Sequence, residues 1–296
     1  MRSLVVLALV GLTAQLVDGA LGMGYGMTST SLLLLAGVAP ASASASVHLA
    51  EIGTALAAGV SHWRFGNIDW HVLRRIALPG ALGAFLGATV LSSLSTAVAA
   101  PWMAAILFTL GVLLLARFAR PLGPGRRTRA GARLLAPLGL VAGFVDATGG
   151  GGWGPVATPS LLAHGHMEPR KVIGSVGAAE VIVAIAASVG FVLGLGRGGF
   201  LLPMVGALLL GGLIAAPVAA WLVRIMPAQV LGVVVGGMIL LTNARVLLAL
   251  VDPALIVWVA VYAGLAVAWL MALTLAVRVM RRVAPTPAPE PQPAPV

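Results

Sequence analysis

Residues 145–155 of this chain read VDATGGGGWGP, and residues 17–26 read VDGALGMGYG. The two stretches align at a shift of 128 residues, so that the aspartate, the spaced glycines and an aromatic residue coincide. A glycine costs a helix about 1 kcal/mol relative to alanine, so glycine clusters inside apolar segments predict breaks in two helices. Because the breaks lie at matched positions, the chain is expected to contain a duplicated unit.

The match continues beyond the two breaks. At shifts of 128 or 129 residues the paired positions are Pro40 and Pro169, Ser46 and Ser175, Glu51 and Glu180, and Gly83 and Gly211. Each half then consists of a broken apolar segment, a helix with one buried glutamate, and two further apolar helices. A unit of four spans begins and ends on the same side of a membrane. We therefore expect the halves to run parallel, related by an axis along the membrane normal.

The composition places these helices in a membrane. Of the 296 residues, 60% are hydrophobic and 9% are charged, and the mean hydropathy is +1.06. Uncharged apolar runs of about 20 or more residues favour membrane-spanning helices over the strands of a barrel and exclude a soluble enzyme. Six of the 18 basic residues, from Arg117 to Arg133, crowd into one linker region instead of lining a groove, which argues against nucleic-acid binding. The chain has no cysteine, so it has neither disulfides nor thiolate metal sites.

The predicted fold class is an all-α polytopic membrane protein, a tandem duplication of a four-helix unit with broken first helices plus one extra C-terminal helix. Apolar runs predict helices at 3–36 and 134–163, both interrupted, and at 41–63, 72–94, 101–118, 170–194, 199–223, 228–249 and 254–277. The predicted organisation is a first membrane repeat (1–119), a basic cytoplasmic linker (120–133), a second membrane repeat (134–250), the extra helix (251–283) and a disordered proline-rich tail (284–296).

Basic residues predict the orientation of the chain. The positive-inside rule places Arg2, the loop from Arg64 to Arg75 and the linker together in the cytoplasm. Nine spans would then place the C-terminal arginines that begin at Arg278 outside the cell, which conflicts with the rule. The choice between eight and nine spans therefore stays open.

Unwound backbone inside a membrane needs protein or water around it, and helix N-termini at a break offer N–H groups and positive dipole ends that suit an anion. We expect a substrate between the two breaks. The candidate binding residues are Gly22, Gly24, Tyr25, Gly26, Thr28, Ser29 and Thr30 in the first half, and Gly150, Gly151, Gly152, Trp153, Gly154 and Thr158 in the second. The alternative is that the glycines only allow helices to pack closely.

Ionisable residues inside the apolar segments are the second candidate feature, because a charge there costs at least about 2.5–3.5 kcal/mol. They are Asp18, His48, Glu51, Asp146 and Glu180. We expect them to couple transport to protons, with Glu51 or Glu180 exchanging the proton and His48 acting as a relay. The alternative is that the acids cap broken helices by accepting backbone N–H bonds, and that His48 is a structural hydrogen-bonding residue.

The residues of both breaks, together with SHWRFGN at residues 61–67, resemble the sulfite exporter TauE/SafE family of bacterial permeases. The resemblance covers about residues 5–250 and leaves out the last helix and the proline-rich tail. It implies a four-helix unit duplicated in tandem. It also implies movement of sulfite, sulfonates or related small sulfur-containing anions across the cytoplasmic membrane. The first half departs from the second by carrying LGMGY in place of the glycine run.

Together these features predict a proton-coupled secondary transporter of a small anion, and the resemblance implies an exporter whose substrate is a small sulfur-containing anion. Its expected partners are that anion and the lipid bilayer of the bacterial inner membrane, and a homo-oligomer is left open. We expect no cofactor, no bound metal, no nucleic-acid partner and no enzymatic activity. The alternative is a divalent-cation transporter in which the buried carboxylates and His48 are ligands.

An intramembrane hydrolase is a further alternative, with Ser44 and His48 one helical turn apart. The sequence supplies no third residue to orient that pair.

Overall fold

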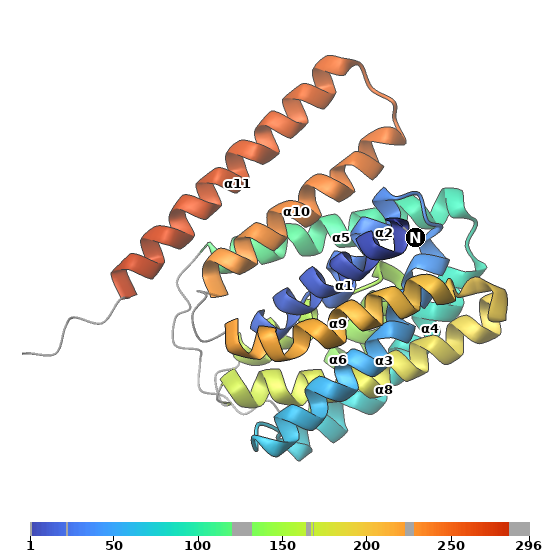
Figure 1. The fold of residues 1–296 in the computed structure, drawn as a ribbon, viewed down its shortest axis with the longest axis vertical. Coiled ribbons are helices and arrows are strands. Elements are labelled where there is room, and N and C mark those ends of the chain that lie inside the picture. The colour runs from blue at the N-terminus through green and yellow to red at the C-terminus, as the bar shows by residue number, and fades with distance from the viewer. Residues whose placement is uncertain are drawn as a thin grey trace, which may run out of the picture.

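The computed structural model describes residues 2–21, 23–119, 132–163, 167, 169–222 and 228–283, and all of these lie in helices or short connections. The helices in Figure 1 are α1 (Arg2–Leu21), α2 (Tyr25–Leu35), α3 (Pro40–Arg64), α4 (Trp70–Ser93), α5 (Thr96–Phe118), α6 (Ala132–Gly149), α7 (Trp153–Ala163), α8 (Pro169–Leu195), α9 (Leu202–Leu222), α10 (Ala228–Ala249) and α11 (Leu255–Val283). Among the described residues, α4, α5, α8, α10 and α11 are long and apolar enough to cross a membrane.

Both predicted helix interruptions are present in the structure. α1 ends at Leu21 and α2 begins at Tyr25, while α6 ends at Gly149 and α7 begins at Trp153. Gly24, Gly150 and Gly151 have φ angles of 128°, 69° and 144°, which residues with a side chain rarely adopt. The glycines therefore end the helices here because they permit a change of direction that a regular helix does not.

Corresponding helices of the two halves pack antiparallel. In the α3–α8 pair, Gly59 near the end of α3 faces Ala178 near the start of α8. His48, in the first third of α3, meets Phe191 near the end of α8, with 5.9 Å between the ring centroids. The α5–α10 pair has the same arrangement, with Gly111 against Ile239 and Phe118 against Gly232.

This antiparallel packing contradicts the expectation of parallel halves. An axis along the membrane normal would have made α3 and α8 parallel, because they are corresponding helices. The halves are instead inverted, which places the axis between them across the helices and hence in the plane of the membrane. The expectation was wrong because it counted each interrupted helix as one crossing.

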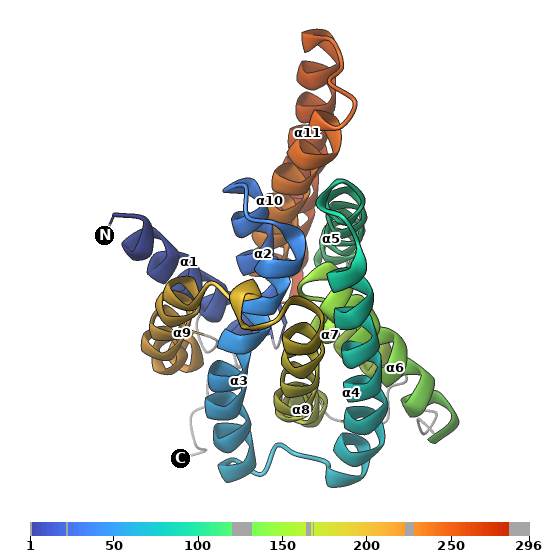
Figure 2. The same cartoon turned by 90° about the vertical axis from the view of Figure 1, so that its right-hand side faces the viewer.

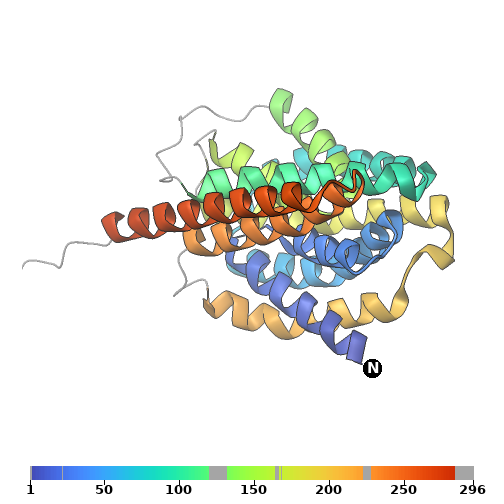
Figure 3. The same cartoon turned by 90° about the horizontal axis from the view of Figure 1, so that it is seen from above.

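The interrupted helices are broken hairpins. α4 runs parallel to α6, with Ile76 near Gly139 and Gly87 near Ala147, and parallel to α8, with Gly80 near Val183 and Ser92 near Gly194. Since α6 and α8 therefore run in the same direction, α7 returns the chain to the end of the bundle from which α6 came. α1 and α2 do the same in Figures 1 and 3, where the N-terminus and the turn before α3 lie at the same end of the bundle.

The hairpins change which connections share a face. The α3–α4 loop, the end of α5, the start of α8 and the end of α11 gather at one end of the bundle, named here the basic end. Lys171 Nζ, in the first turn of α8, donates to the carbonyl of Gly66 in the α3–α4 loop at 2.6 Å. Arg64, Arg74, Arg75, Arg117, Lys171 and Arg278 are among the basic residues at this end, whereas Arg197 and Arg245 lie toward the opposite end.

This arrangement removes the conflict over the C-terminus, because α11 ends at the basic end. It also corrects the placement of Arg2, since α1 begins at the opposite end (Figures 1 and 3). The predicted linker lies outside the described residues except that α6 already begins at Ala132, and the proline-rich tail lies outside them entirely.

The hairpin of each half packs against a crossing helix of the other half. α1 packs along α9 and α4 packs along α6. At these contacts a Cβ atom on Gly83 would overlap the carbonyl oxygen of Leu140, and one on Gly211 would overlap that of Ala8. These matched glycines allow the main chains to touch, as small residues do in membrane bundles.

Two matched serines also form hydrogen bonds between the halves. Ser46 Oγ accepts from the backbone N–H of Leu201, which precedes α9, at 3.0 Å. Ser175 Oγ accepts from the backbone N–H of Asp69, which precedes α4, at 2.8 Å.

α11 stands apart from this core and packs mainly on α10 and, less extensively, on α5 (Figure 2). Two side chains attach it to α10. Trp269 Nε1 donates to the Val233 carbonyl at 2.9 Å, and the Tyr262 hydroxyl donates to the Leu241 carbonyl at 3.2 Å.

Candidate functional site

The two helix breaks meet in the middle of the bundle. A Cβ atom on Gly26 would lie 2.7 Å from the Cα atom of Gly151 and 2.8 Å from Glu51 Oε1. The Thr30 hydroxyl, on α2, donates to the carbonyl of Gly150 in the other break. Glu51 lies midway along α3, so this meeting point is far from both ends of the bundle. The sequence prediction that the two breaks face each other is consistent with this geometry.

Asp146 organises the second break. Its Oδ1 accepts from the backbone N–H groups of Gly152 and Trp153 at 2.7 and 2.9 Å, and so caps the N-terminus of α7. Its Oδ2 lies 3.1 Å from His48 Nε2 on α3, and both side chains are buried. Two amides predicted to bind an anion are therefore already occupied by a residue of the chain.

Each ring nitrogen of His48 faces a hydrogen-bond acceptor. Its Nδ1 lies 2.8 Å from the carbonyl oxygen of Ser44, while its Nε2 faces the Asp146 carboxyl. A neutral imidazole carries only one N–H, so it cannot donate to both acceptors. A protonated imidazole would donate to both, and with the Asp146 carboxylate it would form a pair of zero net charge. Ser44 itself donates through Oγ to the Ala147 carbonyl at 2.7 Å.

The first break repeats the cap but not the histidine. The Asp18 carboxyl accepts a backbone hydrogen bond from Tyr25, as Asp146 does from Trp153. The position that corresponds to His48 is Gly177, and a Cβ atom built there would have open space around it. Asp18 is half-buried, whereas only 3% of Asp146 is exposed. The two breaks are thus alike in backbone and unlike in charge.

The two aromatic residues of the breaks anchor them to the surrounding helices. The Tyr25 hydroxyl donates to the Leu208 carbonyl of α9 at 3.1 Å. Trp153 Nε1 donates to the Val176 carbonyl of α8 at 2.9 Å, and its ring lies directly against Gly80 of α4. Both predicted aromatic residues therefore position the breaks, and their polar atoms are already bonded.

Glu51 and Glu180 complete a cluster of four carboxyl groups. Glu51 is buried, and its Oε2 has no hydrogen-bond partner among the described residues. Glu180, on α8, is half-buried. Both glutamates lie close enough to Asp18 and Asp146 for their charges to interact. In the described ranges, no group of three or more His, Asp or Glu side chains is arranged to hold a metal ion.

A small cavity lies at the meeting point of the breaks. Its volume is about 10 Å³, and it is lined by Gly24, Gly26, Met27, Glu51, Asp146, Gly151, Gly152, Trp153, Gly154, Pro155 and Glu180. Such a space holds about one water molecule, so an oxyanion requires the breaks to move apart.

Of the remaining predicted residues, Thr28, Ser29 and Thr158 are buried, and their hydroxyls have no hydrogen-bond partner among the described residues. Gly22 lies outside the described residues.

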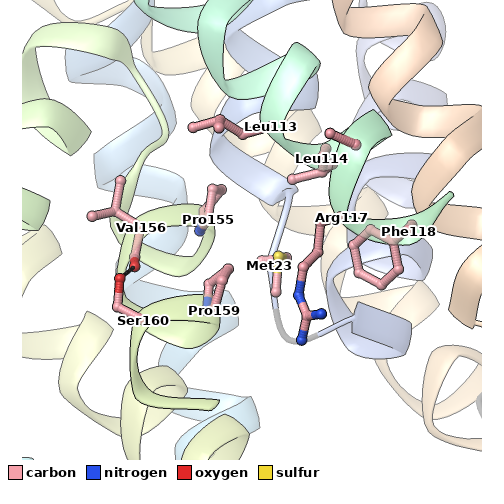
Figure 4. Close-up of a pocket in the computed structure, with 10 residues that line it drawn as sticks. Met23, Leu113, Leu114, Arg117, Phe118, Pro155, Val156, Pro159 and Ser160 are labelled. Carbon is pink, nitrogen blue, oxygen red and sulfur yellow. Dashed lines mark hydrogen bonds between the residues drawn. The ribbon is translucent and has the colours of Figure 1, made fainter. Parts of the chain in front are cut away.

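A larger cavity of about 500 Å³ lies between α5, α7 and the first break (Figure 4). Its lining residues are Met23, Leu113, Leu114, Ala116, Arg117, Phe118, Pro155, Val156, Pro159 and Ser160. Sequence reasoning missed this cavity, because it assigned Arg117 to the basic linker. A signal was present, since the repeat shift of 128 residues aligns Arg117 with Arg245.

Comparisons with known proteins agree with this membrane architecture. A protein-family model described as "Sulfite exporter TauE/SafE" matches residues 7–246. The chain is 49% identical over 251 residues to a protein of Bacillus subtilis (strain 168) named "Probable membrane transporter protein YtnM", and the match covers 84% of each chain. No solved structure matches this chain. The family match ends within α10, so α11 lies outside it.

Proposed function

Because this chain belongs to the sulfite exporter TauE/SafE family of membrane transporters, we propose that it moves a small sulfur-containing anion, such as sulfite or an organosulfonate, together with protons. The substrate class follows the description of the family. The observation that carries the mechanism is the meeting of two broken hairpins beside Glu51 and Glu180, midway along the bundle. We assign the bound anion to this meeting point.

The proposed transport unit is a hairpin followed by three crossing helices, present twice in opposite orientations. Inverted repeats of this kind allow a central site to open alternately to the two sides of a membrane. The positive-inside rule places the basic end in the cytoplasm, and the N-terminus then lies outside. In a bacterium this membrane is the inner membrane.

Charge decides how an anion enters a site with four carboxyl groups. Two unit charges 4 Å apart repel by about 4 kcal/mol at an effective dielectric constant of about 20, which is enough to exclude the substrate. With a protonated imidazole, the His48–Asp146 pair is neutral as a unit and contributes little repulsion. Glu51 and Glu180 have no such partner among the described residues. We therefore assign to these two glutamates the protons that accompany the anion.

A protonated glutamate also supplies a hydrogen-bond donor. Ionised Glu51 only accepts hydrogen bonds and repels an oxyanion, whereas the neutral acid donates its O–H to an anion oxygen. Thr28, Ser29 and Thr158 add hydroxyls that are buried without partners among the described residues. These groups take the place of the Gly152 and Trp153 amides, which already donate to Asp146.

The test is anion flux in proteoliposomes at different pH values. Wild-type uptake of sulfite or an organosulfonate should rise as the pH on the loading side falls, because protons bind with the anion. Glu51→Gln keeps this side chain neutral and should weaken both the pH dependence and proton-driven accumulation while retaining anion exchange, and the double variant with Glu180→Gln should lose both. Asp252→Asn, in the exposed α10–α11 loop, is the control and should behave as wild type. A Glu51→Gln variant with unchanged rate and pH dependence contradicts the assignment.

The rival hypothesis from the sequence is a divalent-cation transporter in which the buried carboxyls and His48 are ligands, although the described residues hold no group of three arranged for a metal. The same proteoliposomes decide between the two. Uptake of nickel or cobalt, with no uptake of sulfite, organosulfonate, sulfate or thiosulfate at any pH, would replace the anion proposal.

A further inference from the structure

The 500 Å³ cavity is lined by the last turns of α5 and by α7, which brings one cationic side chain into an apolar space. In Figure 4, Arg117 lies between Met23 and Phe118 and faces Pro159 of α7 across the cavity. Apart from Ser160, the other lining residues are apolar. An apolar wall strengthens the attraction between an arginine and an anion, because it lowers the local dielectric constant.

This cavity adjoins the central one on the side of the basic end. Pro155 lines both cavities, and Met23, which lines the larger, precedes Gly24, which lines the smaller. From Pro155, α7 runs toward the basic end, where α5 also ends. The larger cavity therefore occupies the space between the central site and the basic end. Pro155 and Met23 lie where the two cavities adjoin.

The corresponding region of the other half is closed by direct contact. The repeat shift makes α10 the counterpart of α5 and α2 the counterpart of α7, and Gly111 packs against its own counterpart, Ile239. Asn243 of α10 is fully buried, and its Nδ2 donates to Ser31 Oγ of α2 at 2.9 Å. The two halves thus differ here, with a cavity between α5 and α7 and a bonded contact between α10 and α2. The contact between α2 and α10 is named here the α2–α10 seam.

The cationic residue is duplicated although the cavity is not. Arg117 and Arg245 are 128 residues apart, each near the end of its own helix, and the antiparallel packing of α5 and α10 places them toward opposite ends of the bundle. In the conformation described here, Arg117 borders the cavity, while Arg245 is exposed near Tyr262 of α11.

We propose that the α5–α7 cavity is the cytoplasmic half of the substrate pathway, with Arg117 as the residue that attracts a small oxyanion into it, and that Arg245 serves the opposite side when the α2–α10 seam opens. This inference rests on the proposed function, because it assumes an anionic substrate. Arginine suits the role since its planar guanidinium binds an oxyanion through two parallel N–H bonds and stays charged at every physiological pH.

Transport kinetics measured from each side of the membrane test the roles of Arg117 and Arg245. In proteoliposomes of known orientation, Arg117→Gln should raise KM for sulfite presented at the basic end by about tenfold, while KM from the opposite side changes little. Arg245→Gln should do the reverse. Arg117→Lys should recover part of the loss, because the charge remains. Arg74→Gln is the control, since Arg74 is exposed at the same end but does not line the cavity.

The absence of cysteine from the chain permits a second test that does not depend on transport. Val156 lines the cavity, and its counterpart Thr28 is buried in the other half. A membrane-impermeant anionic thiosulfonate should modify Val156→Cys from the basic end only and Thr28→Cys from the opposite side only. Replacing Arg117 with Gln in the Val156→Cys variant should slow the modification, because the reagent is itself an anion.

The outcomes separate this inference from the proposed function. If wild-type protein transports sulfite or an organosulfonate but Arg117→Gln leaves both KM values unchanged, the pathway assignment fails and the function stands. Modification of Val156→Cys from the side opposite the basic end would overturn it as well. If wild-type protein transports none of the anions while Val156→Cys still shows the expected sidedness, the cavity is an aqueous vestibule and the anion proposal fails.

Discussion

Asp146 joins three parts of the protein through a single carboxylate. It caps α7 through the Gly152 and Trp153 amides and holds His48 of the other half. Asp18 also caps its own break at Tyr25, but without a histidine. Asp146 therefore has a mainly structural role in the state described, whereas Asp18 faces a less constrained environment.

This difference predicts unequal losses of stability. Asp146→Ala leaves His48 and two buried amides without their partner and should destabilise the protein by about 2 kcal/mol or more. Asp18→Ala removes one backbone bond at a half-buried position and should cost about 1 kcal/mol. Thermal unfolding of both variants in the same detergent measures the order. Equal losses would contradict the structural role assigned to the His48–Asp146 pair.

At the residue scale, sequence reasoning identified the acids, His48 and the glycines of both breaks. It could not pair His48 with Asp146, because these residues are 98 positions apart and meet only when the two halves interlock. It missed Arg117 because a basic residue next to a basic linker has an adequate explanation in the orientation of the chain. The role of Arg117 depends on the cavity that α5 and α7 enclose.

Among the elements, the hairpins α1–α2 and α6–α7 decide the topology. The glycines indicated where each helix ends, and the observed ends at Leu21 and Gly149 lie within the predicted segments. They did not indicate the direction in which the chain continues, because a glycine permits a reversal as readily as a bend. That direction is set by packing of α6 on α4 and α1 on α9, which a linear pattern does not contain.

The seam between α2 and α10 yields a prediction at this scale. Asn243→Leu, which places here the residue found at position 115, removes the bond to Ser31 and should favour the state in which this seam is open. A loss of about 1 kcal/mol shifts a two-state population about fivefold. Thiosulfonate modification of Thr28→Cys from the side opposite the basic end should then become faster, and that of Val156→Cys from the basic end slower.

Thr242→Val is the matched control for this substitution. The Thr242 hydroxyl donates to carbonyls of its own helix and accepts from Asn243 Nδ2 at 3.4 Å, but among the described residues it bonds to nothing on α2, so its loss should leave both modification rates unchanged. Unchanged rates in Asn243→Leu as well would show that the bond between Asn243 and Ser31 does not hold the seam closed.

For the whole molecule, inversion of the two halves changes the sidedness of the loops. Parallel halves would place Asn67, in the α3–α4 loop, and Asp252, in the α10–α11 loop, on the same side of the membrane. The observed helix directions place them on opposite sides, with Asn67 at the basic end. Cysteines at the two positions in intact cells should react differently with an impermeant maleimide. Asp252→Cys should react from outside and Asn67→Cys only after the membrane is permeabilised.

The final helix determines which compartment receives the end of the chain. α11 lies outside the family match. It follows six crossing helices, α3, α4, α5, α8, α9 and α10, and as one more crossing it returns the chain to the basic end. Without α11, residues that follow α10 would emerge on the outer surface. With it, the described chain ends at Val283 at the basic end, which the proposed orientation places in the cytosol. A force applied at that end would pass through α11 directly to α10, which forms one side of the α2–α10 seam.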